Sequence, residues 1–153
     1  MNREQAQYLI EALTFCGIDH LIVVPASGLE LVLGHFEKHG SCIYATREEE
    51  AIAIACGLSL GGEKPMVVMA QAGLGNTLNA VFTLADAYDI YFPILVCFRG
   101  KRDPNPVQRV SAKHTHLVLS VLDCVEVSWD APEGKGEFKR LVNERQRWIK
   151  CSL

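Results

Sequence analysis

Hydrophobic and polar positions alternate with two different periods along the chain. Short runs of β-branched and aliphatic residues, bounded by Pro, Gly or polar residues, predict buried strands at 21–24, 42–44, 66–70, 93–98 and 124–127. Longer stretches with apolar residues three and four apart predict helices at 4–16, 27–39, 46–61, 76–88, 117–121 and 137–149. This alternation predicts an α/β three-layer sandwich: a mostly parallel central sheet with helices on both faces.

Capping and turn residues punctuate this pattern. Gly17 is placed to close the first helix, and Ser27 to cap the second. Thr46 and Glu49 have the spacing of a capping box at the start of the third helix. The segment 99–108 holds three basic residues and two prolines, so we expect an exposed loop there.

Composition narrows the class of protein. At 153 residues the chain fits one domain, 1–153, and 49% hydrophobic with 22% charged residues is ordinary globular usage. A net charge of −3 argues against binding to nucleic acid or to an anionic membrane. The chain shows neither a secretory signal nor an apolar run near the roughly 20 residues of a membrane helix. Six isolated cysteines are typical of buried thiols in a reducing compartment, so we expect a cytoplasmic protein.

The first candidate site is the acidic start of the third helix. Ligands of parallel sheets bind beyond the carboxyl ends of the strands, where loops enter helices. The capping box accounts for Glu49, and acids in a first turn also suit the helix dipole, which accounts in part for Glu50. Glu48 is left at the rim of the strand end, where a carboxylate can face a ligand.

A second candidate is the glycine-rich turn Gly73-Leu74-Gly75-Asn76, which follows a strand and precedes a helix. Glycines let a backbone approach a ligand closely. The turn is neither a P-loop nor a complete G-x-G-x-x-G, because position 78 is Leu. A tight strand-to-helix turn with no ligand explains it equally well.

Cations and histidines after the strand at 93–98 form the third candidate. Arg99, Lys101 and Arg102 can hold a phosphate, sulfonate or carboxylate, although an ordinary solvated loop is the alternative. His114 and His116, expected on a loop, can bind a metal or move protons, but no third ligand is in view. We therefore predict no metal site.

Together these segments resemble the pyrimidine-binding domain of thiamine-diphosphate enzymes, in the branch of the sulfopyruvate and phosphonopyruvate decarboxylases. The segments that carry the resemblance are Thr46–Ala51, Ala55–Gly57, Gly61-Gly62, Gly73–Asn76 and Pro93–Gly100. The resemblance implies that a glutamate hydrogen-bonds the cofactor's pyrimidine and so activates the carbon that attacks a 2-oxo acid. In the family that glutamate precedes a helix glycine by nine residues, and nine before Gly57 is Glu48.

The resemblance also implies roles for the other site residues. It implies cofactor contacts from Pro25 and from residues 73–76, and it places the substrate near Ala26, Gln71, Arg99, Lys101, Arg102 and His114. Two positions depart from the family pattern: Ala70-Gln71-Ala72 stands where relatives carry Gln-Asn-Ser, and Ala26 where many carry Asp. Both changes remove polar groups near the expected substrate pocket.

The resemblance implies a partner chain. No Gly-Asp-Gly with a downstream Asn occurs, so the diphosphate and Mg²⁺ are expected on a β subunit that shares the thiamine diphosphate. A homodimer or hetero-oligomer follows, and the apolar stripe Ala80, Val81, Leu84 and Ala85 is either its interface or internal packing. Three readings of function remain: a 2-oxoacid decarboxylase subunit, a carboligase or lyase subunit, and a catalytically silent binding subunit. A flavodoxin-like nucleotide binder is disfavoured, because the glycine turn lacks a phosphate-binding pattern.

Overall fold

The computed structural model describes residues 1–100, 103–129 and 133–152. Its elements in chain order are α1 (Arg3–Phe15), β1 (His20–Val23), α2 (Glu30–Lys38), β2 (Cys42–Tyr44), α3 (Glu48–Leu60), β3 (Pro65–Ala70), the 3₁₀ turn η1 (Gln71–Gly73), α4 (Leu74–Ala80), the π-helical turn η2 (Val81–Asp86), β4 (Ile94–Phe98), α5 (Pro106–Val121), β5 (Val125–Val127), α6 (Glu133–Asn143) and β6 (Trp148–Ser152).

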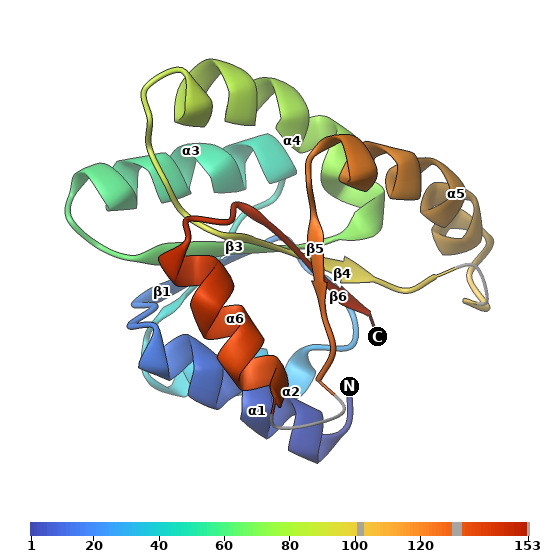
Figure 1. Ribbon diagram of the computed structural model, residues 1–153, viewed down its shortest axis with the longest axis horizontal. Helices are drawn as coiled ribbons and strands as arrows, with labels where there is room; N and C mark the ends of the chain where they lie inside the picture. The colour runs from blue at the N-terminus through green and yellow to red at the C-terminus, as the bar shows by residue number, and fades with distance from the viewer. Residues whose placement is uncertain (101–102, 130–132, 153) are drawn as a thin grey trace.

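The described strands form a six-stranded sheet in the order β2-β1-β3-β4-β6-β5, with every neighbouring pair parallel (Figure 1). Because the strands are parallel, all their carboxyl ends lie at one edge of the sheet. The helices that follow β2, β3 and β4 therefore begin at that edge. The α/β sandwich with helices on both faces is confirmed, and the sheet is parallel throughout.

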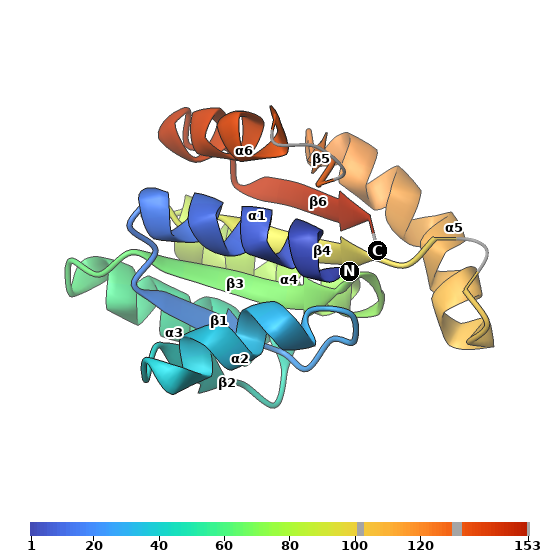
Figure 2. The same cartoon turned by 90° about the horizontal axis from the view of Figure 1, so that it is seen from below.

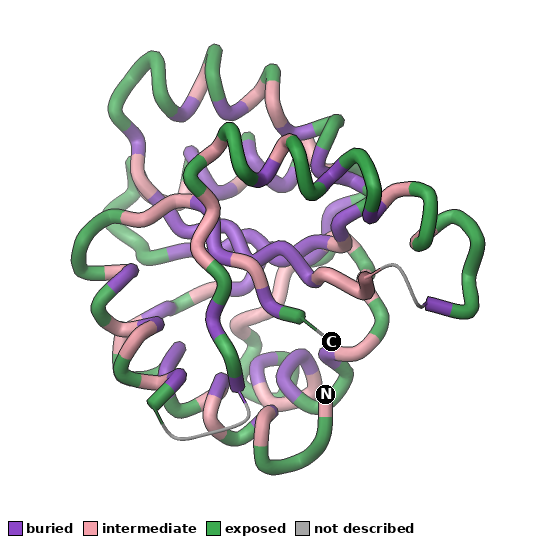
Figure 3. Tube along the Cα trace, turned by 45° about the vertical axis from the view of Figure 1, so that its right-hand side comes forward, coloured by how far each residue is buried: buried purple, intermediate pink, exposed green. Residues whose placement is uncertain are grey.

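Two layers of helices cover the sheet (Figure 2). Alternate strand residues point to opposite faces, so Leu21 and Val68 pack with α1, α2 and α6, whereas Ile22 and Val67 pack with α3, α4 and α5. Figure 3 shows the result: the strands are almost wholly buried, and the outer turns of the helices are exposed. Among the described residues, no helix is both long and apolar enough to cross a bilayer.

The first helix illustrates how local sequence sets these elements. Asn2 caps α1: its side chain accepts the amide of Gln5 at 2.9 Å, and the Gln5 side chain accepts the amide of Asn2 at 2.9 Å. Gly17 adopts φ +66° directly after the helix, as its predicted closing role requires. The Ser27 cap is wrong, because α2 begins at Glu30 after Leu29 and no side chain caps it.

The second half of the chain differs most from the pattern-based prediction. Residues 106–108 of the expected loop and the short helix expected at 117–121 belong to one helix, α5, which Asn105 caps through the amide of Val107 at 2.9 Å. The helix expected at 137–149 ends at Asn143, and β6 follows. β6 was not predicted, yet it lies inside the sheet between β4 and β5.

The helix expected at 76–88 also begins earlier than predicted. The chain turns directly from β3 into η1 and α4, so residues 73–76 form a helical start and not an open loop. Val81 and Ala85 are fully buried against the sheet. Internal packing therefore explains these two residues of the apolar stripe at 80–85.

Candidate active site

Three helix starts converge at the carboxyl edge of the sheet. α3 follows β2, the η1–α4 segment follows β3, and α5 follows β4, and each begins at this edge (Figure 1). α3 contacts α4, and α5 contacts η1. Helix N-termini carry partial positive charge, so this edge favours carboxylates and other anions.

Glu48 lies at the centre of this convergence. It is the first residue of α3, and its Oε2 accepts a hydrogen bond from Asn76 Nδ2 at 2.9 Å. A Cβ atom built on Gly73 would lie 1.9 Å from Glu48 Oε1, so only glycine fits beside this carboxylate. Glu48 lies 25 residues before Gly73 and 28 before Asn76 in sequence, and the fold brings the three together as one cluster, which we call the Glu48 cluster.

The two neighbouring glutamates are occupied elsewhere. The helix starts at Glu48 after Arg47, so the predicted box of Thr46 with Glu49 is wrong by one position. Glu50 Oε2 accepts the Thr46 hydroxyl at 2.7 Å and the Thr46 amide at 2.8 Å, and these hydrogen bonds lower the pKa of Glu50. The pKa of Glu49 is lowered by its own backbone amide and by the Arg47 guanidinium, whose Nε lies 2.7 Å from Glu49 Oε1.

Gln71 lies beneath the Glu48 cluster and not on its surface. Its side chain is only 1% exposed: Nε2 donates to the carbonyl of Gln108 at 2.8 Å, and Oε1 accepts the amide of Arg99 at 3.0 Å. Its carbonyl accepts the hydroxyl of the buried Thr115 at 3.2 Å. Gln71 therefore joins the ends of β3 and β4 to α5, and its contact with substrate stays a prediction.

Arg99 spans two of the loops at the carboxyl edge. Its Nε lies 2.6 Å from Oδ2 of Asp103, whose side chain is 4% exposed, and its Nη1 donates to the Ser27 hydroxyl. Ser27 follows Pro25 and Ala26 after β1, so Arg99 ties the β1 and β4 loops together. Among the described residues, Nη2 of Arg99 has no hydrogen-bond partner and stays available to an anion.

Asp103 and Ser27 are the site residues that the pattern missed. Asp103 stands four residues after Arg99, the spacing of a local ion pair, and this was the available signal. No comparable signal marked Ser27, because its role depends on how two distant loops meet.

The remaining predicted site residues differ in how far they are exposed. Pro25 is exposed and Ala26 half-buried in the loop after β1, while Gly75 is exposed and Leu74 buried at the start of α4. His114 and His116 are exposed on α5, and not on a loop as predicted. Within residues 1–100, 103–129 and 133–152, no hydrogen bond or ion pair joins either histidine to the Glu48 cluster. Lys101 and Arg102 lie outside the described residues.

The donor set fits an aromatic heterocycle better than a metal. The cluster offers one carboxylate, one carboxamide and a backbone cradle, all at an open edge where Gly75 and Asn76 are exposed. A carboxylate can accept the N–H of a protonated ring, and the Gly73 cradle brings backbone close to a flat ligand. In the part of the chain that the structure describes, no group of three His, Cys, Asp or Glu side chains could hold a metal ion.

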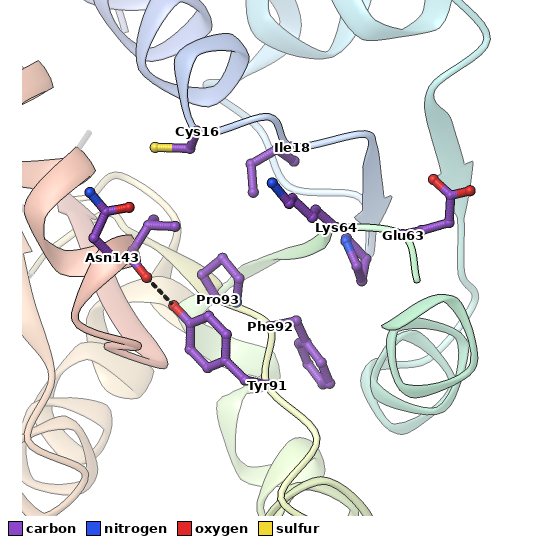
Figure 4. A pocket seen from close by; sticks show the side chains of 10 residues that line it. Cys16, Ile18, Glu63, Lys64, Tyr91, Phe92, Pro93 and Asn143 are labelled. Atoms are coloured by element: carbon purple, nitrogen blue, oxygen red, sulfur yellow. Dashed lines mark hydrogen bonds between the residues drawn. The ribbon is translucent and has the colours of Figure 1, made fainter. Parts of the chain in front are cut away.

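A separate cavity of about 310 Å³ lies at the opposite, amino edge of the sheet. Its lining includes Cys16, Lys64, Tyr91 and Asn143 (Figure 4). The Tyr91 hydroxyl is directed at the carbonyls of Val142 and Gln146, at 3.3 and 3.2 Å. Burial raises the pKa of Tyr91 to about 12, so this hydroxyl stays protonated. The cavity lies at the edge of the sheet opposite to the one that carries Glu48.

Comparison with known proteins assigns the chain to a family. Residues 3–109 match the family described as "Thiamine pyrophosphate enzyme, N-terminal TPP binding domain". The chain belongs to this family. Benzoylformate decarboxylase from Polynucleobacter necessarius has the same fold, with a TM-score of 0.70 and 19% identity over 99% of this chain and 30% of that one.

Within the family, the chain is similar to sulfopyruvate decarboxylase alpha subunits. It is 31% identical over 148 residues to the one from Methanococcus maripaludis, which covers 94% of this chain and 85% of that protein. It is 30% identical over 137 residues to the one from Methanocaldococcus jannaschii, covering 88% and 79%. A phosphonopyruvate decarboxylase from Streptomyces viridochromogenes is 28% identical over 127 residues, covering 79% of this chain and 31% of that protein.

Proposed function

We propose that this chain is the α subunit of a thiamine-diphosphate-dependent 2-oxoacid decarboxylase that converts 3-sulfopyruvate into sulfoacetaldehyde and CO₂. One observation carries the proposal. The Glu48 carboxylate is held by Asn76 at 2.9 Å and lies against Gly73 at the carboxyl edge of the sheet. It does so in a chain 31% identical to a sulfopyruvate decarboxylase alpha subunit.

Glu48 is the residue that we assign to the chemistry. Its carboxylate would hydrogen-bond a ring nitrogen of the cofactor's aminopyrimidine, with Asn76 fixing the carboxylate from the other side. Pro25 and residues 73–76 would line the same ring. When bound, thiamine diphosphate would supply the electron sink that the loss of CO₂ from a 2-oxo acid requires.

Arg99 is the residue that we assign to the anionic head group of the substrate. Asp103 and Ser27 hold two of its nitrogens, so the guanidinium is fixed in place before any ligand arrives. A fixed guanidinium offers its remaining N–H groups to a sulfonate at a low cost in side-chain entropy. Lys101 and Arg102 follow in the same segment and extend its positive charge.

The outer surface of α3 and α4 supports a partner chain beside the Glu48 cluster. Residues 51–60 and 71–85 contain no Asp, Glu, Lys or Arg, although Leu60 and Phe82 are 75% and 49% exposed. The helices on the other face, α1, α2 and α6, all carry several charged residues. Large exposed apolar side chains on a surface without charged residues are typical of a contact with another protein. We therefore assign this uncharged surface to the partner that would supply Mg²⁺ and diphosphate binding, in a hetero-oligomer.

Phosphonopyruvate is the second candidate substrate. The similarity to a phosphonopyruvate decarboxylase favours it, and its phosphonate presents the same problem of charge to Arg99. Both substrates are 2-oxo acids with an anionic group on the adjacent carbon, so both use the same proposed residues.

The test is CO₂ release by the chain combined with its partner subunit, with thiamine diphosphate, Mg²⁺ and either 3-sulfopyruvate or phosphonopyruvate. We expect Glu48→Gln to keep the thermal unfolding profile of the wild type and to lose at least about 100-fold in turnover, because an amide cannot exchange a proton with the ring nitrogen.

Glu50→Gln is the matched control, since Glu50 lies in the same helical turn but its carboxylate binds Thr46. Its turnover should stay within a few-fold of wild type. Near-normal turnover of Glu48→Gln would reject the role of Glu48. An inactive wild-type complex would favour a silent binding subunit, and would make Ala26, Ala70 and Ala72 the residues to examine.

A further inference from the structure

A line of exposed apolar side chains runs along the outer side of α5. Val107, Val110, Leu117 and Val121 are 61, 56, 65 and 82% exposed, and His114 is exposed between them. We call these five residues the α5 seam. α5 begins at the carboxyl edge of the sheet and runs along that side of the molecule toward β5 (Figures 1 and 2).

The spacing of the α5 seam is regular. Its members follow one another by three, four, three and four residues. At 3.6 residues per turn they fall within an arc of about 80° and extend over about 21 Å. The residues that α5 buries against the sheet, Ala112, Thr115 and Leu119, lie on the opposite side of the helix. This is the a/d pattern by which one helix packs against another.

Charge selects the kind of helix that fits. Lys113 borders the α5 seam on one flank, and Arg109 lies further round the helix on the same side, where its Nη1 also donates to the carbonyls of Asp103 and Pro104 at 2.9 and 2.7 Å. α5 contains no Asp or Glu. A second copy of this chain, packed seam to seam, would bring four cations together with no acid to offset them. A helix with carboxylates on its facing flank would pair with Arg109 and Lys113.

The shape of the seam argues against a membrane. Helices that lie in a bilayer surface present a wide apolar face rich in Trp, Phe and Leu. The α5 seam is narrow, contains no aromatic ring of that kind and is mostly valine. A narrow a/d stripe is the geometry of helix–helix contact.

We infer that the α5 seam docks an amphipathic helix of another protein chain, with apolar residues at a/d spacing and carboxylates facing Arg109 and Lys113. This inference is independent of the decarboxylase proposal, because it uses no residue of the Glu48 cluster. Its failure would leave the proposed chemistry unchanged.

The experiment uses a synthetic helical peptide as the probe. The peptide has three heptads with Ile at a, Leu at d and Glu at the flanking positions, and it carries a fluorescent label. A second peptide carries Lys at the same flanks. We expect the full chain, titrated by fluorescence anisotropy, to bind the Glu-flanked peptide at least tenfold more tightly than the Lys-flanked one.

Single variants locate the binding surface. Leu117→Glu and Val110→Glu, each at an exposed position, should weaken binding at least tenfold while keeping the wild-type circular dichroism spectrum. Lys113→Glu should reduce the preference for the Glu-flanked peptide several-fold. Leu31→Glu, at a 49% exposed position on α2, is the matched control and should bind as wild type.

Three results would overturn the inference. Equal binding of both peptides would remove the role of charge. Concentration-dependent dimerisation that Leu117→Glu abolishes would make a second copy the occupant. Binding to vesicles of phosphatidylserine and phosphatidylcholine that Leu117→Glu abolishes would make a membrane the occupant.

Discussion

Glu48 and Gly73 share a space that admits no further atom. The Cβ of any other residue at position 73 would lie 1.9 Å from Glu48 Oε1 and 2.7 Å from its Cγ. The obstructing atoms belong to the end of a flexible side chain, which can rotate away at little cost. The close approach therefore fixes the position of the carboxylate more than it fixes the stability of the fold.

Replacing Gly73 separates these two effects. We expect Gly73→Ala to change the free energy of unfolding by no more than about 1 kcal/mol, while it displaces the Glu48 carboxylate from Asn76. Gly75→Ala is the control, because nothing lies within 4 Å of its added Cβ, and the Glu48–Asn76 hydrogen bond should remain. Thermal unfolding and crystal structures of both variants measure the outcome. An unmoved carboxylate in Gly73→Ala would contradict the prediction.

The residues of the site differ in how far the sequence alone could identify them. Glu48 could be singled out because the predicted capping box accounted for Glu49 and the helix dipole in part for Glu50, which left Glu48 without a role. That reasoning singled out the residue that lies against Gly73 and Asn76, although the capping register was shifted, since it is Glu50 that binds Thr46. The partners of Arg99 could not be read in the same way, because Ser27 is 72 residues away in sequence and meets it only after folding.

At the scale of elements, α5 and β6 show where periodicity misleads. Two prolines and three cations made the start of α5 look like a loop, yet Pro106 is at the first helical position, which proline favours. Only three residues of α5 are buried, so its inward pattern is weak, and the exposed valines of the α5 seam obscure it further. The sequence pattern predicts helix through β6, because Trp148 and Ile149 continue the apolar spacing of the preceding helix. The break falls at Arg145, which adopts φ +59°.

The cap of α5 provides a test of that element. Asn105→Ala removes the side-chain oxygen that accepts the amide of Val107, and we expect a loss of about 1 kcal/mol in the free energy of unfolding. Asn105→Asp keeps the acceptor and is the control, expected to match wild type. Urea denaturation followed by circular dichroism provides both values. An unchanged midpoint for Asn105→Ala would show that the cap contributes nothing to stability.

At the scale of the whole molecule, the burial of the cysteines shows how completely the helices enclose the sheet. Cys97 and Cys151 are neighbours on β4 and β6 and are almost fully buried. Burial raises the pKa of Cys151 to about 12 and raises that of Cys97 well above its usual value. The prediction of buried thiols holds for Cys56, Cys97 and Cys151, while Cys16, Cys42 and Cys124 are half-buried.

These environments predict an order of reaction with a thiol reagent. A raised pKa suppresses the thiolate, so at pH 8 the buried thiols are both shielded and protonated. We expect Cys16 and Cys42 to be labelled in the native chain, and Cys97 and Cys151 only after unfolding. Mass spectrometry of peptides from native and urea-treated samples checks this order. Rapid labelling of Cys97 in the native chain would show that the sheet opens between β4 and β6.

The position of β6 also has a consequence for the order in which the chain can fold. β5 is made before β6, but among the described strands it is hydrogen-bonded to β6 alone. β5 therefore has no strand to pair with until residues 148–152 have left the ribosome and docked on β4. Assembly must proceed as two events: the half of the sheet formed by β2, β1, β3 and β4 can close first, and β6 then recruits β5 from outside. Until that second event, the free side of β4 is an open edge that a strand of another chain can occupy.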